Sequence, residues 1–292
     1  MRVVSQVGEP LRGLRVARVA DYGAIEDLRH ARTHGDPVDA EAKIIALSRE
    51  LMSPAVAGIG IGIPGRVDFA ARLALSGGFL DLSRVDLAVN VEAALARPVV
   101  IDSDANLALV AEARYGAARD CRNVVMLTIG TGIGAAALVD GRILRGRRSA
   151  GQFGHVTVDH AGLPCACGRR GCVETTSSGT ALGRLVREAG LDADTRAGAL
   201  LDAAEAGDGA ERDVILRWVL PLRAAIDSLV AALDPERVVL GGGLGADAAR
   251  ALAFAPALSE WYQAPVVAAE LGDSAGVIGA AFSARRPESD PS

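Results

Sequence analysis

Three of the chain's four cysteines lie within eight positions, and two histidines precede them. Thiolate sulfur and imidazole nitrogen are ligands that zinc prefers, and three cysteines with one histidine complete a tetrahedral site, which favours a structural ion. The spacing matches no common zinc finger, and the alternative is a surface loop with reduced thiols. The sequence predicts a zinc-binding loop over residues 154–174. Its candidate ligands are Cys165, Cys167, Cys172 and His155, with His160 as a rival to His155.

Two carboxylates lie in the stretch "VVIDSDAN", residues 99–106. Asp102 and Asp104 come where a predicted strand ends and a helix begins. Ligands of open α/β sheets bind at the carboxyl ends of strands, where a carboxylate can act as general base toward a hydroxyl. The plain alternative for Asp104 is a helix N-cap. This segment alone does not decide which of the two aspartates is the base.

Two glycine-rich stretches could hold a nucleotide: "LTIGTGIGAA" (127–136) and "VVLGGGLGADAA" (238–249). Glycines let backbone amides approach a phosphate closely, and a strand, glycine loop and helix start together form an anion site. Each stretch could also be an ordinary tight turn. Two such loops beside a strand-end carboxylate indicate nucleotide chemistry more strongly than either loop does.

Strands and helices must position these groups, and the sequence shows the apolar pattern of both. Apolar runs rich in Val and Ile alternate with stretches of helical period, which is typical of an α/β protein. Strands are expected at 14–20, 55–65, 98–101, three times within 123–144, and at 237–243 as the last strand. Helices are expected at 40–53, 89–96, 106–117, 179–190, 219–233 and 245–255.

Composition narrows the function classes. A chain of 292 residues with 50% hydrophobic residues favours two packed lobes. A net charge of −5 argues against a nucleic-acid surface, and Lys43, the only lysine, leaves little room for a catalytic lysine. We expect a soluble cytoplasmic protein without membrane contact, because the start lacks a signal peptide's apolar region and no apolar run reaches a bilayer-spanning length of about 18 residues.

The motif "SAGQFGH" followed by "CACGRRGCVE", with "DSDAN" and "GTGIG" upstream, resembles the ROK family of bacterial sugar kinases and repressors. The resemblance runs from about Gly58 to Gly243. It implies an actin-like, hexokinase-type (ribonuclease H-like) α/β fold of two lobes, with the zinc loop in the C-terminal lobe. The expected lobes are residues 1–106, on which a helix around 274–284 packs back, and residues 107–273.

The resemblance also implies a glucokinase-like role for named residues. Asp104 matches the catalytic base, whereas Asp102 has no role in the family pattern. The residues at the positions of the family's sugar contacts are Ser103, Gln152, His155 and Glu174. Those that match the second phosphate loop are Gly130, Thr131, Gly132 and Gly134, and those of the adenosine loop are Gly241, Gly242 and Gly243. The implied zinc ligands are His155, Cys165, Cys167 and Cys172.

The chain departs from the family pattern at its start. ROK kinases begin with a strand and an Asp-x-Gly-Gly-Thr turn that holds phosphate and Mg²⁺; here only Gly8 of "SQVGEPLRG" (5–13) matches. Gln6 replaces the carboxylate, Glu9 adds a negative charge and Pro10 removes a backbone donor. Two sugar contacts differ as well, since Ser103 replaces an Asn and Gln152 a Glu, which suggests a ligand other than plain glucose.

Two functions are favoured, and a third possibility is that the zinc and sugar residues serve different chemistry on the same fold. The first is an ATP-dependent carbohydrate kinase with structural Zn²⁺ and with ATP and Mg²⁺ as the phosphoryl source. The second is a sugar-binding sensor without catalysis, because the degenerate first turn affects positioning and charge neutralisation, on which phosphoryl transfer depends. ROK repressors carry an N-terminal helix-turn-helix of some tens of residues before this fold, and we expect none here, so the expected partners are sugar and nucleotide, not nucleic acid. The family resemblance implies a homodimer or homotetramer.

Overall fold

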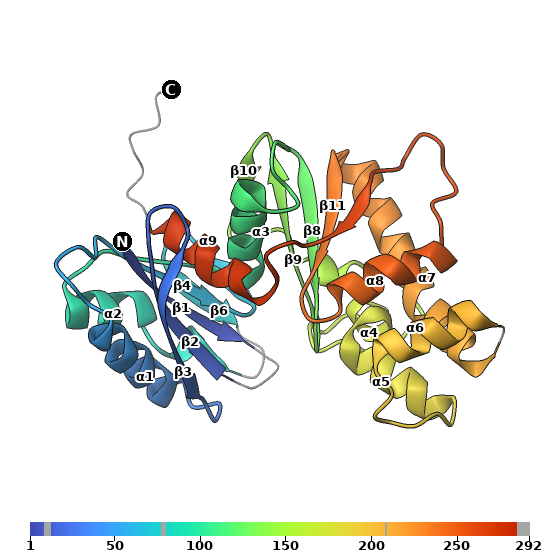
Figure 1. Cartoon of the computed structure of the whole chain (residues 1–292), viewed down its shortest axis with the longest axis horizontal. Helices are drawn as coiled ribbons and strands as arrows, with labels where there is room; N and C mark the ends of the chain where they lie inside the picture. Colours follow the sequence, from blue (N-terminus) through green and yellow to red (C-terminus); the bar gives the residue numbers. More distant parts are fainter. Residues whose placement is uncertain (9–12, 77–79, 208, 285–292) are drawn as a thin grey trace. The chain divides into compact units, whose positions relative to one another are not determined.

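The chain forms two compact units (Figure 1). The computed structural model describes residues 1–8, 13–76, 80–207 and 209–284. Unit 1 comprises Met1–Tyr115, Arg145–Ala150 and Asp273–Ser292, and unit 2 comprises Gly116–Leu144 and Gly151–Gly272. The division expected at residue 106 lies inside a helix, and the first unit continues to Tyr115. The segment Arg145–Ala150 belongs to unit 1 although the chain on both sides of it belongs to unit 2.

Unit 1 contains a mixed five-stranded sheet in the order β3-β2-β1-β4-β7. Its first three strands form an antiparallel meander, and β4 and β7 continue the sheet parallel to β1. The carboxyl ends of β1, β4 and β7 therefore share one edge of the sheet. The strands are β1 (Arg2–Gly8), β2 (Gly13–Val19), β3 (Ile25–Arg32), β4 (Ile59–Ile63) and β7 (Val99–Ser103), and a separate hairpin joins β5 (Arg66–Asp68) to β6 (Leu73–Ser76).

Helices cover both faces of this sheet. The alternating sequence "IGIGI" of β4 places isoleucine side chains on one face and glycines on the other. Its three isoleucines pack into one apolar cluster with residues of α1 and α2. On the other face Gly60 has no side chain because an added Cβ would lie 2.1 Å from the carbonyl oxygen of Ala280. The helices are α1 (Pro37–Glu50), α2 (Leu87–Leu95), α3 (Asp104–Tyr115) and α9 (Ala275–Ser283).

Unit 2 has a second five-stranded sheet in the order β10-β9-β8-β11-β12, and its apolar core surrounds the fully buried Trp218. The strands are β8 (Val124–Ile129), β9 (Ile133–Val139), β10 (Arg142–Ile143), β11 (Arg237–Gly241) and β12 (Val266–Ala268). The helices are α4 (Glu174–Ser177), α5 (Gly179–Glu188), α6 (Ala197–Ala206), α7 (Ala210–Leu233) and α8 (Gly245–Ala251). The expectation that 237–243 is the last strand is wrong, because β12 pairs in parallel with β11.

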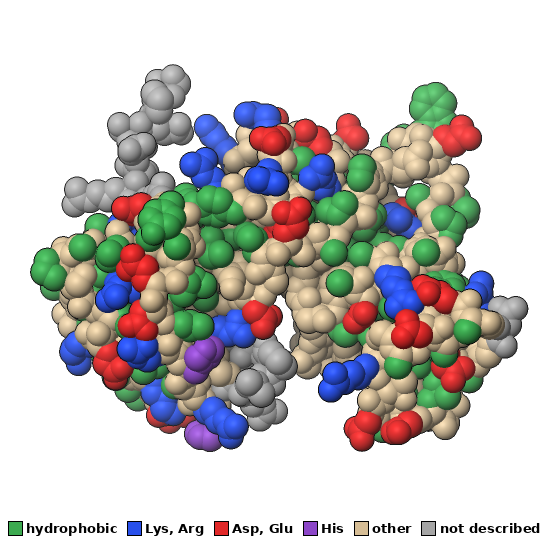
Figure 2. Space-filling model, viewed as in Figure 1, with side chains coloured by type: hydrophobic (Ala, Val, Ile, Leu, Met, Phe, Trp, Pro, Cys, Tyr) green, Lys and Arg blue, Asp and Glu red, His purple; other side chains and the backbone are tan. Residues whose placement is uncertain are grey.

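Polar and apolar residues separate as expected for water-exposed units. Figure 2 shows basic and acidic side chains intermixed over the visible face of each unit. Among the described residues the most exposed large apolar side chains are Leu258 and Trp261, in the loop before β12. Within the described ranges no helix is both long and apolar enough to cross a bilayer.

Candidate functional site

The carboxyl edge of the unit 1 sheet carries the predicted carboxylates. Gln6 of β1 is in register with Gly62 of β4, which in turn is in register with Asp102 of β7. Ser103 ends β7, and Asp104 is the first residue of α3. Strand β7 thus delivers Asp104 to the edge at which open α/β sheets bind ligands.

Asp104 holds a partly buried carboxylate with weak local support. Its Oδ1 accepts a hydrogen bond from the Ala105 amide at 2.8 Å and a longer one from the Ser103 hydroxyl at 3.5 Å. Burial raises the pKa of Asp104 to about 6, and these two hydrogen bonds oppose the rise only in part. The N-cap alternative does not describe this geometry, because Asp104 is itself helical and bonds the next amide in the chain.

Asp102 is fully engaged. Its Oδ1 accepts from the Ser103 amide at 2.8 Å and the Asn106 side-chain amide at 2.7 Å. Its Oδ2 accepts from the Arg145 guanidinium at 2.6 Å, and that guanidinium lies 3.8 Å from the ring centre of Phe69. Only 2% of the Asp102 side chain is exposed. A buried carboxylate that already pairs with a cation and two amide donors is poorly placed to take a substrate proton, so of the two aspartates Asp104 is the more available.

The segment that corresponds to the first phosphate turn is only partly described. Gln6 lies in β1, and its buried Oε1 has no hydrogen-bond partner among the residues that the structure describes. An added Cβ on Gly276, in α9, would lie 2.4 Å from Gln6 Nε2, so this amide packs against the start of that helix. Glu9 and Pro10 lie outside the described residues.

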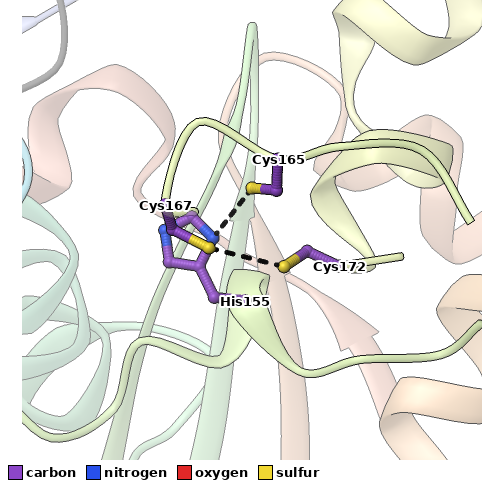
Figure 3. A group of neighbouring side chains, drawn as sticks. All are labelled: His155, Cys165, Cys167 and Cys172. Atoms are coloured by element: carbon purple, nitrogen blue, oxygen red, sulfur yellow. Dashed lines mark hydrogen bonds between the residues drawn. The ribbon is translucent and has the colours of Figure 1, made fainter. Parts of the chain in front are cut away.

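The predicted metal ligands of unit 2 converge (Figure 3). The ligand atoms of His155, Cys165, Cys167 and Cys172 all lie within 4.8 Å of one another. His155 Nδ1 is 3.6 Å from Cys165 Sγ, and Cys167 Sγ is 3.6 Å from Cys172 Sγ. Atoms bound to one tetrahedral zinc at its usual bond lengths lie about 3.5–3.8 Å apart. The donor set therefore fits zinc, whereas His160 is exposed and lies outside the group.

Local backbone geometry brings these four residues together. His155 ends the 3₁₀ turn Phe153–His155, and Thr157 forms an antiparallel bridge with Cys172. The chain folds back sharply at Gly171, whose φ is +64°. Only a glycine fits there, because an added Cβ would lie 1.5 Å from the Asp159 carbonyl oxygen. Burial raises the pKa of the Cys172 thiol to about 12, so binding of a metal there must displace protons.

The first glycine-rich loop is both a hairpin turn and a platform of backbone groups. It joins β8 to β9, and the Gly130 amide donates to the Gly132 carbonyl at 2.9 Å. The start of α5 holds the loop from outside, since the Gly179 amide donates to the Gly130 carbonyl at 2.7 Å and the Thr180 hydroxyl to the Thr131 carbonyl at 2.8 Å. The Thr131 side chain remains exposed.

The second glycine-rich loop borders a pocket of about 360 Å³ in unit 2. Gly243 lines it, whereas Gly241 and Gly242 serve the turn: an added Cβ on Gly242 would lie 2.5 Å from the Ile129 carbonyl oxygen. The full lining is Gly179, Leu182, Gly183, Val186, Thr195, Arg196, Ala197, Gly243, Leu244 and Asp247. The mixture of an apolar wall with a few charged groups is typical of small-molecule sites.

Sequence reasoning missed three charged residues of these sites. Arg145 bonds Asp102 from 43 positions away, a separation that no local pattern shows. Arg196 and Asp247 reach the pocket from the starts of α6 and α8. Of these only Asp247 had a signal, because it directly follows the glycine loop in the sequence.

Comparison with known proteins identifies the family of the chain. Residues 24–286 match the model of the ROK family. A glucokinase of Halalkalibacterium halodurans is 34% identical over 79% of this chain and 77% of its own. An N-acetylmannosamine kinase of Yersinia pestis is also 34% identical, over 79% of each chain. A solved ROK family glucokinase from Streptomyces griseus, in complex with glucose and AMPPNP, is 28% identical, with a TM-score of 0.80 over 97% of this chain and 99% of that one. The chain therefore belongs to the ROK family.

Proposed function

We propose that the protein is an ATP-dependent kinase that phosphorylates a hydroxyl of a hexose, hexosamine or related sugar or cyclitol, with Asp104 as general base. One observation carries the proposal. Asp104 lies at the carboxyl edge of the sheet with a pKa raised to about 6, whereas Asp102 forms an ion pair with Arg145. General bases work best when their pKa lies near the working pH. The relatives named as glucokinase and N-acetylmannosamine kinase support the same reaction class.

In this mechanism the sugar hydroxyl gives its proton to the Asp104 carboxylate as its oxygen attacks the γ-phosphorus of ATP. The bond from that phosphorus to the β,γ-bridging oxygen breaks, and ADP leaves with the electron pair. The protein mainly positions the groups and stabilises charge in such a transfer. Base catalysis of this kind contributes about 10²–10⁴-fold to the rate.

Unit 2 would bind the nucleotide. The loop of Gly130, Thr131, Gly132 and Gly134 would bind phosphate oxygens through its backbone amides other than that of Gly130, which donates to the Gly132 carbonyl, and the exposed Thr131 hydroxyl adds a donor. The pocket beside Gly243 would take the adenosine, with the apolar wall against the base. Gly241 and Gly242 would act indirectly, by shaping the turn that leads to this pocket.

The sugar contacts proposed are Ser103, Gln152, His155 and Glu174. A zinc ion bound by His155, Cys165, Cys167 and Cys172 would be structural, because four protein ligands leave no open position. His155 would coordinate through Nδ1, the atom that faces Cys165, so its Nε2 could donate to a sugar oxygen. Mg²⁺ would enter with ATP and neutralise phosphate charge; the Gln6 amide offers it no anionic ligand.

Gln6 also favours a second candidate, a sugar sensor without catalysis. An amide stands here at the position where the family has a carboxylate, and within the described ranges its buried Oε1 has no partner. A sensor would bind sugar and would turn over no nucleotide.

A panel assay separates the two candidates. ADP release is measured with ATP, Mg²⁺ and a series of hexoses, hexosamines and cyclitols, and binding of each sugar is measured by calorimetry. The kinase proposal predicts sugar-dependent ADP release with at least one member of the panel. Sugar binding without ADP release on any member would contradict it and support the sensor.

A further inference from the structure

Glu174 links the Cys-His cluster (His155, Cys165, Cys167 and Cys172) to the first glycine-rich loop, and both lie in unit 2. It follows Cys172 by two positions and begins α4. Its Oε2 accepts a hydrogen bond from the Ile133 amide at 2.9 Å, and its Oε1 is 3.9 Å from the Cys165 sulfur. One side chain thus contacts a proposed metal ligand at one oxygen and the loop backbone at the other.

The loop is shaped to receive this carboxylate. An added Cβ on Gly132 would lie 2.6 Å from Glu174 Oε2, so the missing side chain makes room for the carboxylate. Gly154, which precedes the proposed ligand His155, also packs against the end of the loop. An added Cβ on Gly154 would lie 2.1 Å from the Ile133 carbonyl oxygen. Both backbone groups of Ile133 therefore face residues adjacent to the cluster.

The chain that follows Glu174 completes this support. The Gly179 amide and the Thr180 hydroxyl bond the carbonyls of Gly130 and Thr131, at 2.7 and 2.8 Å. Residues 174–180 thus hold the backbone of residues 130–133 at three points. Their upstream end is fixed at the cluster, where the Val173 amide donates to the Val156 carbonyl at 2.9 Å and Cys172 pairs with Thr157.

From these contacts we propose that Glu174 is a positioning residue that couples metal occupancy of the Cys-His cluster to the conformation of the 130–133 loop. The inference rests on the proposed function for the identity of the metal and the nucleotide. A bound metal would fix Cys172, the chain from Cys172 through Val173 would fix Glu174, and Glu174 would hold the Ile133 amide in place. The Cys165 contact would not contribute, because a metal-bound thiolate has no proton to donate to a carboxylate. Metal and nucleotide then favour each other's binding, because coupling between two sites is reciprocal.

The test measures the loop directly. Hydrogen exchange of the amides in 127–136 is compared between zinc-loaded and chelator-treated wild type, without sugar or nucleotide. Chelation should speed exchange in the loop about tenfold or more. The affinity for AMPPNP with Mg²⁺, measured by calorimetry, should weaken about 5- to 30-fold, which is within the usual range of coupling between sites. Unchanged loop exchange in chelated but folded wild type overturns the proposal.

Variants that keep the metal make the test independent of folding without it. Zinc-loaded Glu174→Ala should already show the fast loop exchange and weak AMPPNP binding, at unchanged zinc content. Glu174→Gln keeps an acceptor oxygen and should restore most of the protection. Glu260→Gln, an exposed glutamate in the loop before β12, is the matched control. Wild-type loop exchange in Glu174→Ala overturns the coupling, even if that variant binds sugar poorly.

The outcomes also separate this inference from the proposed function. Wild type that contains no zinc, or that never binds AMPPNP, contradicts the proposed function. If the protein binds both zinc and AMPPNP but hydrogen exchange in the loop is unchanged in Glu174→Ala, only the coupling is contradicted.

Discussion

Asp102 and Asp104 are two residues apart, yet their carboxylates are in opposite states. Asp102 is enclosed by the Ser103 amide, the Asn106 side chain and the Arg145 guanidinium. Asp104 accepts from the Ala105 amide and weakly from Ser103, and burial raises its pKa to about 6. Charge compensation thus anchors Asp102 in the fold, and its absence leaves Asp104 with the raised pKa that suits the general base we propose.

The first prediction concerns pH. A general base works only when deprotonated, and Asp104 has a pKa raised to about 6. We expect kcat/KM for the preferred sugar to rise about tenfold per pH unit below 6 and to level off above about 7. A pH–rate profile from 4.5 to 8 checks this, provided that circular dichroism shows the fold intact throughout. A profile that is flat from pH 5 to 8 would oppose the assignment.

The second prediction concerns stability. The folded-state pKa of Asp104 lies above its ordinary value of 3.8, so folding favours the protonated form. The carboxyl's contribution is fully present below about pH 4 and is lost as pH rises through about 6. Asp104→Asn removes the buried charge and should raise Tm at pH 7.5 by about 2–6 °C, from a penalty of at most about 3 kcal/mol that partial exposure reduces. The difference in Tm between the variant and wild type should vanish near pH 4. Thermal scans of both proteins at pH 4 and pH 7.5 test this. A lower Tm for the variant than for wild type at pH 7.5 would count against a destabilising buried charge.

The third prediction concerns the ion pair of Asp102 with Arg145. Arg145→Met leaves a buried carboxylate without its cation and should destabilise unit 1 by about 2–4 kcal/mol. The double variant with Asp102→Asn should recover part of this loss, because it removes the uncompensated charge as well. Arg147→Met, at an exposed neighbour in the same segment, is the control and should change little. Urea unfolding of the four proteins gives the comparison; a double variant no more stable than Arg145→Met would show that the pair is not the cause.

The fourth prediction concerns metal. A closed four-ligand site predicts about one zinc per chain in protein purified without chelator. Cys165→Ser should lose most of this zinc, whereas Cys121→Ser should keep it, because Cys121 is a free thiol outside the cluster. Elemental analysis settles the stoichiometry. Zinc near zero in the wild type, or equal zinc in both variants, would argue against the site.

The fifth prediction separates two adjacent glycines. Gly242 has a φ of +78°, and an added Cβ would meet the Ile129 carbonyl oxygen at 2.5 Å. Gly242→Ala should therefore lower the Tm of unit 2 by several degrees. Around Gly243 the space for a Cβ is open, so Gly243→Ala should keep its Tm and instead weaken nucleotide binding at the pocket. Thermal scans and AMPPNP calorimetry distinguish the two; equal Tm losses would contradict the roles assigned here.

Local pattern predicted much of this structure, and distant contacts account for most of what it missed. The strand-end carboxylates, both glycine loops and the cysteine cluster are sequence-local, so spacing revealed them. The ion pair of Asp102 could not be predicted, because its partner Arg145 is distant in the sequence and contacts Asp102 only in the folded unit. Strand β3 was missed because, as an edge strand with four charged residues and a histidine in "IEDLRHAR", it lacks an apolar run. Strand β12 was missed because it is three residues long and follows a proline.

The central claim is that Asp104 takes the proton from a sugar hydroxyl during phosphoryl transfer. Its most direct test is the steady-state rate of sugar-dependent ADP release by wild type, Asp104→Asn and Asp86→Asn. Asp86 is an exposed aspartate of the same unit, at a helix start without a capping hydrogen bond, so its variant controls for the change of charge. The account predicts that Asp104→Asn lowers kcat about 10²–10⁴-fold with the sugar still bound, and that Asp86→Asn retains wild-type activity. An Asp104→Asn protein that releases ADP at the wild-type rate would contradict it.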